Sequence, residues 1–226
     1  IWRNQRLRSV GALHRLVPGR PIWSSHRGDP LADRGLFYGD GLFETILVSN
    51  GIPRLLNLHL RRLQRSAAAL GISLPPDLRD ELYRGLRESR ARHAVLKLIV
   101  SREATGRGYA ADTGAASQLH LMVYARDAPG LNPEVPAEVS VGLCRTRLAR
   151  QPALAGHKHL NRLEQVLARS EWQRADIAEG LMLDTDEKLI EGTACNLFLV
   201  QSGVLKTPSL AHSGVAGVMR EWVMQQ

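Results

Sequence analysis

Lys158 is the residue of this sequence that is best placed to do chemistry. It follows a turn of small residues, and Leu160, Leu163 and Leu167 recur after it at helical spacing. A lysine amine becomes a useful nucleophile where a confined site lowers its pKa, and such lysines form Schiff bases with carbonyl compounds. We therefore expect Lys158 to stand at the head of a helix as a Schiff-base lysine. The alternative is an ordinary exposed lysine at a helix start.

Glu191 is the second candidate for chemistry. It opens the run Glu191-Gly192-Thr193, a turn between two apolar segments that are typical of strands. A carboxylate in such a turn can keep a pyridinium nitrogen protonated. The alternative is an ordinary acidic turn residue, and spacing alone leaves both interpretations open.

Four separated segments carry a family resemblance, in matching order and spacing. They are residues 33–45 (DRGLFYGDGLFET), 59–63 (HLRRL), 158–165 (KHLNRLEQ) and 191–198 (EGTACNLF). Together they resemble the fold-type IV pyridoxal-phosphate enzymes, a family of branched-chain and D-amino-acid aminotransferases and 4-amino-4-deoxychorismate lyases, with the lyases most similar. The resemblance, over residues 29–226, implies an α+β fold with an α/β N-terminal domain and a strand-rich C-terminal domain. It also implies a homodimer with pyridoxal 5'-phosphate in the interdomain cleft.

The resemblance assigns the cofactor-binding residues. Arg62 would grip the phosphate with its planar guanidinium, although a solvated helix face shared with Arg61 and Arg65 is the alternative. Backbone N–H groups of residues 217–219, at the start of a final helix, would bind the same anion, with simple capping as the alternative. The full set implied is Lys158, Arg62, Glu191, Thr193, Asn196, Gly217, Val218 and Met219.

Substrate and catalytic residues follow from the same resemblance. Thr45 stands where branched-chain aminotransferases have glycine, and its hydroxyl would relay a proton to the leaving fragment. Arg107, in a glycine-flanked loop, would bind a substrate carboxylate, with an exposed loop arginine as the alternative. Tyr38 resembles the aromatic lining of the substrate face, or is a core residue. Arg162 stands where aminotransferases usually have tyrosine, and this favours a lyase.

The reaction implied is the conversion of 4-amino-4-deoxychorismate to p-aminobenzoate and pyruvate, in folate synthesis. Lys158 would hold the cofactor and act as general base, while Glu191 keeps the pyridinium protonated. Two alternatives remain. One is an aminotransferase on the same fold, with the same lysine and glutamate. The other is a non-catalytic basic binding module.

Composition limits the class of protein. The chain has 226 residues, of which 44% are hydrophobic and 23% charged, as in ordinary globular proteins. No apolar run approaches the roughly 18 residues that a membrane span needs, so no membrane partner is expected. Cys144 and Cys195 form neither a CxxC pair nor a metal-ligand pattern, so we expect a cytoplasmic protein with no metal site and with Cys195 as a small buried thiol.

The formal net charge of +8 is concentrated at the start of the chain. Residues 1–28 contain six arginines and no carboxylate. No aromatic interleaving or groove-reading motif accompanies these arginines, so we expect a small-molecule substrate and no nucleic-acid partner. We interpret residues 1–28 as a basic tail that is disordered or non-native.

The remaining chain reads as two domains. We expect an N-terminal α+β domain over residues 29–125, a linker rich in proline over 126–136, and a strand-rich cofactor-binding domain over 137–226. Family members usually continue past the final helix, so we expect this second domain to be incomplete, truncated at its C-terminus.

Within these domains the pattern predicts particular elements. A hairpin is expected around the Asn50-Gly51 turn, with strands over 42–48 and 54–56. A helix capped by Asn57 and ended by Gly71 follows, and then a helix after Pro75-Pro76. Later strands are expected at residues 95–101, 119–124, 139–143, 181–184, 189–190, 196–200 and 204–206.

Overall fold

The computed structural model describes residues 20–126, 139–172 and 177–226. The chain divides into two compact units, Ile1–Gly130 and Leu131–Gln226. Most of the segment predicted as the linker, residues 126–136, lies outside the described residues, as do residues 1–19 of the expected tail.

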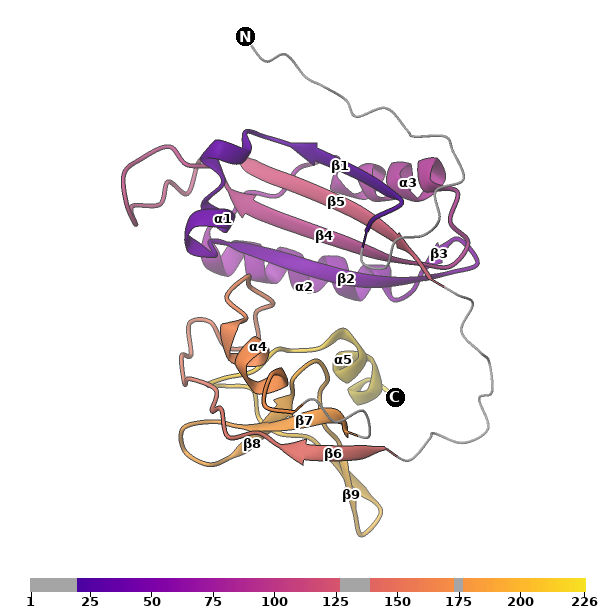
Figure 1. Ribbon diagram of the computed structural model, residues 1–226, viewed down its shortest axis with the longest axis vertical. Helices are drawn as coiled ribbons and strands as arrows, with labels where there is room; N and C mark the ends of the chain where they lie inside the picture. Colours follow the sequence, from indigo (N-terminus) through magenta and orange to yellow (C-terminus); the bar gives the residue numbers. More distant parts are fainter. Residues whose placement is uncertain (1–19, 127–138, 173–176) are drawn as a thin grey trace. The chain divides into compact units, whose positions relative to one another are not determined.

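The first unit is an antiparallel sheet of five strands in the order β1-β5-β4-β2-β3. Helices α2 and α3 cover one face of this sheet and leave the other face open (Figure 1). The strands are β1 (Trp23–Arg27), β2 (Gly41–Ser49), β3 (Ile52–Pro53), β4 (Ala94–Arg102) and β5 (Ser117–Ala125). The helices are α1 (Arg34–Tyr38), α2 (Leu56–Leu70) and α3 (Leu78–Ser89), with a short 3-10 helix at Pro30–Ala32 before them.

Strict alternation along β2 builds the core of this unit. Leu42, Ile46 and Val48 are buried beneath the helices, whereas Thr45 is exposed on the other face, because successive side chains of a strand point to opposite faces. Strands β4 and β5 alternate in the same way. Leucines spaced by three or four residues on both helices complete the cluster. The predictions of these strands and of both helices are confirmed.

The predicted details between β2 and α2 are partly wrong. Asn50 and Gly51 have the positive φ of a tight hairpin turn, at 53° and 77°, as expected. The returning strand is only Ile52–Pro53, rather than residues 54–56, because the chain enters α2 through Leu55 in a left-handed conformation. Asn57 therefore lies inside α2 and caps nothing; its Oδ1 accepts a hydrogen bond of 2.9 Å from Arg79 Nη2.

The interpretation of residues 1–28 as a tail is wrong for its last part. Residues 23–27 form β1, an edge strand paired with β5. Trp23 packs against the core directly over Gly85, where a Cβ would lie 2.6 Å from the indole ring. Arg27 Nη2 forms an ion pair of 2.9 Å with Asp77 Oδ2. Because one tryptophan supplies the burial, the segment lacks the apolar alternation that predicts a strand.

The second unit is smaller in its core and less regular. Strands β6 and β7 are parallel, β7 and β8 are antiparallel, and β9 and β10 form a separate hairpin. The elements are β6 (Ser140–Leu143), α4 (Leu163–Arg169), β7 (Ile177–Leu183), β8 (Leu189–Gly192), β9 (Leu199–Gln201), β10 (Val204–Lys206) and α5 (Val218–Met224). The buried cluster consists of Cys144, Leu148, Ala168, Met182 and Ile190, with Trp172 and Leu210 packed against it.

Two predictions about this unit are wrong. Helix α4 begins at Leu163, so Lys158 does not stand at a helix start. Leu163 and Leu167 of this helix are exposed within the unit, by 75% and 60%, and its buried residue is Ala168. Cys195 is exposed rather than buried. Among the described residues, no helix combines the length and apolar character that crossing a bilayer requires.

Candidate active site

Lys158 lies in an irregular segment that the second unit holds through backbone contacts. Gly156, with φ +80°, donates its N–H to the Gly214 carbonyl at 2.8 Å and accepts from the N–H of Ala216 at 3.1 Å. The lysine side chain is half-buried. The residues just before Lys158 are therefore fixed against residues 214–216, far along the chain.

Residues 214–216 also hold Glu191. The backbone N–H of Val215 donates to Glu191 Oε2 at 2.8 Å, while its carbonyl accepts from Asn196 Nδ2, also at 2.8 Å. Gly214 has φ +81°, and a Cβ there would lie 2.7 Å from Ile190 and 3.2 Å from Glu191 Oε2. The structure thus brings the segment of Lys158 together with Glu191 and Asn196 around one backbone segment.

Glu191 is a buried acid at the end of β8, not a turn residue. Its side chain is 4% exposed. Burial raises the pKa of its carboxyl, although the Val215 N–H and the nearby positive charges of Arg162 and Lys158 act in the opposite direction. The other oxygen, Oε1, has Gln165 Nε2 at 3.5 Å, which is too long for a strong hydrogen bond. A cationic N–H donor would satisfy this oxygen.

Arg162 fixes the backbone on both sides of Lys158. Its Nε donates to the His159 carbonyl at 2.9 Å and its Nη2 to the His157 carbonyl at 3.1 Å. Burial, together with the charge of Arg162, lowers the pKa of His159 to about 4, so this imidazole is neutral at pH 7. Its Nδ1 is buried without a hydrogen-bond partner among the described residues.

The turn after β8 donates several hydrogen bonds to Glu179, a carboxylate of the same unit. Glu179 Oε1 accepts from the N–H of Gly180 at 2.8 Å and of Thr193 at 3.1 Å, and also from the Thr193 hydroxyl. Its Oε2 accepts from the N–H of Ala194 at 3.2 Å. Burial would raise the pKa of Glu179, but these hydrogen bonds outweigh it and lower the pKa. The hydroxyl of Thr193, predicted to bind phosphate, is thus directed to Glu179.

Residues 217–219 begin the short helix α5. Gly217 is its N-terminal flanking residue, and a Cβ there would overlap Asn196 Oδ1. Val218 is buried, whereas Met219 is 55% exposed. With seven residues the helix contributes little dipole. The phosphate role of this turn remains a prediction from the resemblance.

Arg62, the second predicted phosphate residue, is buried in the first unit. It forms a bidentate ion pair with Glu44, in which its Nε donates to Oε1 at 2.8 Å and its Nη2 donates to Oε2. His59 Nδ1 lies 2.6 Å from the same Oε2. The solvated-face alternative is therefore wrong for Arg62, whose exposure is 4%, and right for its exposed neighbours Arg61 and Arg65. Much of its hydrogen-bonding capacity is directed to Glu44.

Tyr38 and the loop that carries Arg107 lie near one another in the first unit. Tyr38 ends α1 and is 41% exposed, so the core alternative is wrong. Its ring centroid lies 5.4 Å from that of Tyr109, which belongs to the same exposed loop as Arg107. Thr45 lies on the open face of the sheet, opposite Lys97 in register.

Sequence reasoning missed several polar and ionisable residues that organise the candidate site and the first unit. They are Arg34, Asp40, Glu44, His59, Arg102 and Glu179. The sequence does contain one signal: Glu44 stands at the same strand parity as Leu42, Ile46 and Val48, which marks it as buried and hence paired. The partners themselves lie too far away in sequence to be read from the pattern.

Comparison with known proteins decides the family. The profile described as amino-transferase class IV matches residues 41–226, most of the chain. The chain belongs to the amino-transferase class IV family. The fold-type IV resemblance is thereby confirmed.

Similar members of the class IV family have different activities. The chain is 37% identical to an aminodeoxychorismate lyase of Vibrio harveyi over 197 residues, which cover 87% of this chain and 72% of that protein. It is 33% identical to a putative branched-chain-amino-acid aminotransferase of Methanocaldococcus jannaschii, over 85% of this chain and 67% of that protein. The crystal structure of 4-amino-4-deoxychorismate lyase from Pseudomonas aeruginosa matches with a TM-score of 0.81 and 45% identity, over 90% of this chain and 76% of that one. The predicted class IV fold is confirmed.

Proposed function

We propose that this chain is a pyridoxal-phosphate-dependent lyase that converts 4-amino-4-deoxychorismate to p-aminobenzoate and pyruvate, a step of folate synthesis. The observation that carries the proposal is the convergence of the Lys158 segment and buried Glu191 on residues 214–216. The two lyases described above, 37% and 45% identical to this chain, favour this reaction over transamination. The relative from M. jannaschii makes a branched-chain aminotransferase the second candidate, and the family resemblance adds a D-amino-acid aminotransferase to it.

The second unit has most of the groups that pyridoxal phosphate needs. Lys158 offers an amine for the aldehyde carbon, and Glu191 offers a buried carboxylate whose Oε1 has no strong donor within the described residues. Buried His159 Nδ1, beside the lysine, is also unpaired in the described part of the chain. We assign the phosphate to Arg62, Thr193 and residues 217–219, with Asn196 holding that last turn. Rearrangement of the contacts of Arg62 and Thr193 is part of this assignment.

Each residue has a separate task in the proposed reaction. Pyridoxal phosphate, when bound, supplies an electron-withdrawing ring that stabilises negative charge on the amine-bearing carbon. Lys158 anchors the cofactor and then removes the proton from that carbon, while Arg162 keeps the lysine backbone in place. Glu191 holds the ring nitrogen by a charged hydrogen bond.

The leaving fragment requires a proton donor and a carboxylate receptor. We assign the first role to the Thr45 hydroxyl and the second to Arg107, whose loop contacts Tyr38 through Tyr109. Loss of the proton and cleavage of the enolpyruvyl C–O bond leave an aromatic ring, and the released enolpyruvate becomes pyruvate. Aromatisation supplies the driving force.

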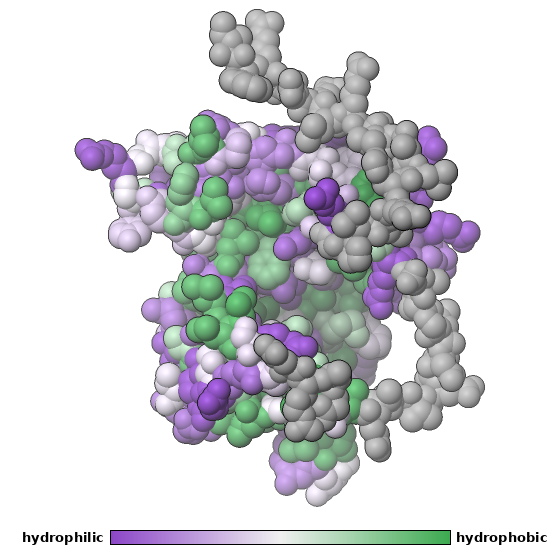
Figure 2. All heavy atoms as spheres, in the orientation of Figure 1, coloured by the Kyte–Doolittle hydropathy of each residue, from purple (hydrophilic) through white to green (hydrophobic). Residues whose placement is uncertain are grey.

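We further propose that the chain works as a cytoplasmic homodimer. Family resemblance supports this, and so do large apolar side chains that gather on the visible surface of the units (Figure 2). On α1, Leu36 is exposed by 73% and Phe37 by 56%. Light scattering during gel filtration should give twice the chain mass of 25.0 kDa.

Covalent trapping tests the lysine assignment. The chain has four lysines, Lys97, Lys158, Lys188 and Lys206, so peptide mapping is unambiguous. After incubation with pyridoxal phosphate and reduction with borohydride, the label should lie on Lys158 and disappear in Lys158→Ala. Label that persists at equal yield in Lys158→Ala would defeat the assignment.

Product analysis separates the lyase from the aminotransferase. With 4-amino-4-deoxychorismate, the protein should release p-aminobenzoate and pyruvate in equal amounts without any keto acid. Thr45→Val should slow this release and Thr45→Ser should restore it, with cofactor absorbance unchanged in both. Transamination of D-alanine or a branched-chain amino acid, with no p-aminobenzoate formed, would establish the second candidate instead.

A further inference from the structure

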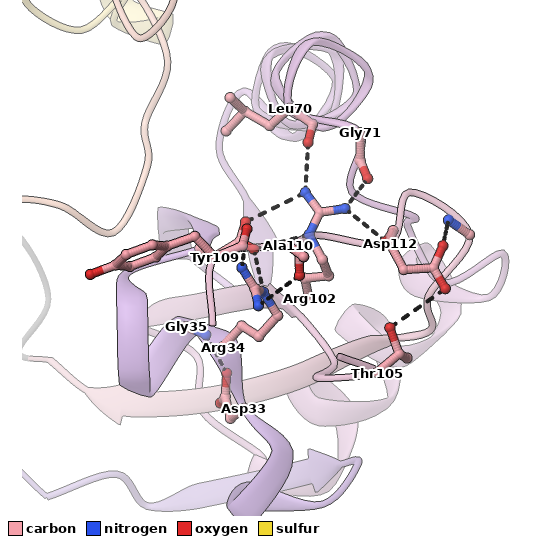
Figure 3. A network of polar contacts seen from close by, with 12 residues as sticks. Asp33, Arg34, Gly35, Leu70, Gly71, Arg102, Thr105, Tyr109, Ala110 and Asp112 are labelled. Atoms are coloured by element: carbon pink, nitrogen blue, oxygen red, sulfur yellow. Dashed lines mark hydrogen bonds and ion pairs between the residues drawn. The ribbon is translucent and has the colours of Figure 1, made fainter. Parts of the chain in front are cut away.

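Arg34 is a buried arginine with four acceptors, and neither the sequence pattern nor the proposed reaction explains it. Its side chain is 5% exposed. Its Nη1 donates to the carbonyls of Gly108 at 2.9 Å and Ala110 at 3.2 Å, and its Nη2 to that of Tyr109 at 3.4 Å (Figure 3). Its Nε pairs with Asp40 Oδ2 at 2.8 Å. One guanidinium thus holds three consecutive carbonyls of a loop more than seventy residues away.

These carbonyls belong to the residues directly after Arg107. All side chains of residues 105–114 are exposed, Tyr109 by 87%, and Gly108 adopts φ +63° with open space around it. The loop therefore buries almost nothing that offsets the conformational entropy lost when it is ordered. Hydrogen bonds to its backbone have to supply that stabilisation, and the three from Arg34 are the ones next to Arg107.

A second arginine holds the far end of the same loop. Arg102 Nη1 donates to the Asp112 carbonyl at 3.1 Å, and its Nη2 donates to the Leu70 carbonyl at 2.7 Å. Its Nε shares Asp40 Oδ2 with Arg34, at 3.0 Å. Burial would raise the pKa of Asp40, but Arg102 and Arg34 outweigh it and lower the pKa, so the bridge is ionised at neutral pH. Figure 3 shows both guanidinium groups directed at the loop backbone.

Arg34 also contacts the other residue assigned to the substrate. Its guanidinium carbon lies 4.8 Å from the centroid of the Tyr38 ring, on the helix that Arg34 itself begins. Asp33 fixes that helix start, because its Oδ1 accepts from the Gly35 N–H at 2.8 Å. Arg34 therefore sets the position of the Arg107 loop relative to Tyr38, and only a planar fork can serve all of these acceptors at once.

We infer that Arg34 is a positioning residue that orders the Arg107 loop against Tyr38 and so determines how tightly the chain recognises a carboxylate-bearing substrate. The inference rests on the proposed function for the role of Arg107, but the anchoring of the loop does not. The two parts can be measured separately in the full chain.

Limited proteolysis measures the anchoring. Trypsin cleaves after Arg107, and cleavage requires local opening of the loop. Arg34→Lys, which keeps a tryptic residue and a positive charge, should accelerate cleavage at this bond about tenfold because the fork is lost. Arg87→Lys, at an exposed position of α3, is the matched control and should leave the rate unchanged. An unchanged rate in Arg34→Lys overturns the inference.

A double-mutant cycle measures the effect on recognition. Arg34→Lys should lower kcat/KM for 4-amino-4-deoxychorismate about tenfold, mainly through KM, and by less than about twofold in an Arg107→Ala background. Additive losses overturn the inference. An unchanged KM in Arg107→Ala alone refutes the substrate role of Arg107 in the proposed function, and with it the recognition part, whatever the trypsin result.

Gly108→Ala provides a second variant that cannot unfold the core. The residue is exposed with φ +63°, so an alanine strains the loop where it meets Arg34 while clashing with nothing. It should reproduce the faster cleavage and the higher KM, without adding to the effects of Arg34→Lys. A Gly108→Ala protein with wild-type cleavage and KM overturns the inference even if Arg34→Lys fails to fold.

Discussion

The buried ion pair of the first unit gives a quantitative prediction. Glu44, 1% exposed, accepts hydrogen bonds from Arg62 Nε and Nη2 and lies 2.6 Å from His59 Nδ1. Glu44→Ala takes from buried Arg62 the carboxylate to which its Nε and Nη2 donate, and removing one partner of a buried pair costs about 3–5 kcal/mol. Glu44→Gln keeps the shape of the side chain and one acceptor oxygen. It should therefore lower the free energy of unfolding by less, about 1.5–3 kcal/mol, the value of one charged hydrogen bond.

The stability effect of Glu44 should depend on pH. Burial would raise the pKa of its carboxyl, but the hydrogen bonds from His59 and Arg62 outweigh it and lower the pKa below 4.5. A depressed acid pKa contributes stability that is fully present above the unfolded-state pKa and is lost as pH falls through the folded-state pKa. The free-energy difference between wild type and Glu44→Gln should therefore be constant near pH 7 and shrink below about pH 4.5.

Hydrogen exchange of β4 amides measures this difference within the first unit. These amides pair with β2 and β5 and exchange through global opening of the unit. Exchange rates in wild type, Glu44→Gln and Glu44→Ala, at pH values from 4 upward, give the free energies of opening. The electrostatic reasoning would be refuted if Glu44→Ala lowered the free energy of opening by less than about 1 kcal/mol. It would also be refuted if the difference in this free energy between wild type and Glu44→Gln did not change with pH.

Three further predictions concern single residues. Burial raises the pKa of Glu191, so the ionised carboxylate destabilises the folded protein increasingly as pH rises above 4.5. Glu191→Gln should therefore raise the free energy of unfolding of the cofactor-free protein in urea at pH 8 and leave it unchanged at pH 4. Equal effects at both pH values would contradict this. Arg62→Ala should weaken pyridoxal-phosphate binding in equilibrium dialysis while Arg61→Ala does not, and equal losses would remove the phosphate role. Gly180→Ala would place a Cβ 1.9 Å from the Trp172 ring and should cost about 1–3 kcal/mol in urea unfolding, so a neutral result would show that the ring moves freely.

Local patterns predicted the elements whose burial is periodic. Buried and less buried residues alternate along strands β2, β4 and β5, and the leucines of α2 and α3 recur at helical spacing. The sequence therefore predicted which face of each of these elements is buried. The same reasoning missed β1, because its burial comes from one tryptophan resting on Gly85, a contact between distant residues. It also placed a cap at Asn57, since nothing local predicts the left-handed Leu55, two residues earlier, that precedes the first residue of α2.

The candidate site was predictable in residue type but not in arrangement. The residues next to Lys158 and Glu191 in the sequence, and the resemblance, identified both as candidates. Their connection, however, runs through the Val215 N–H and Gly214, which no sequence pattern marks as close to them. The helix expected after Lys158 illustrates the same limit. Its spacing is helical, but the regular helix starts only at Leu163, and Leu163 and Leu167 are exposed within the unit rather than buried.

Glu44, Glu179 and Glu191 show how the structure separates an acid that organises its own unit from an acid suited to a ligand. Glu44 and Glu179 each collect several donors from their own unit, and these outweigh burial so that the pKa of each falls. Glu191 is as buried as Glu44 but receives one strong hydrogen bond, from Val215, and its pKa rises. A buried acid that its own unit leaves under-solvated is stabilised by an external cationic donor. A pyridinium N–H is such a donor, and Lys158 lies within electrostatic reach of the same carboxyl.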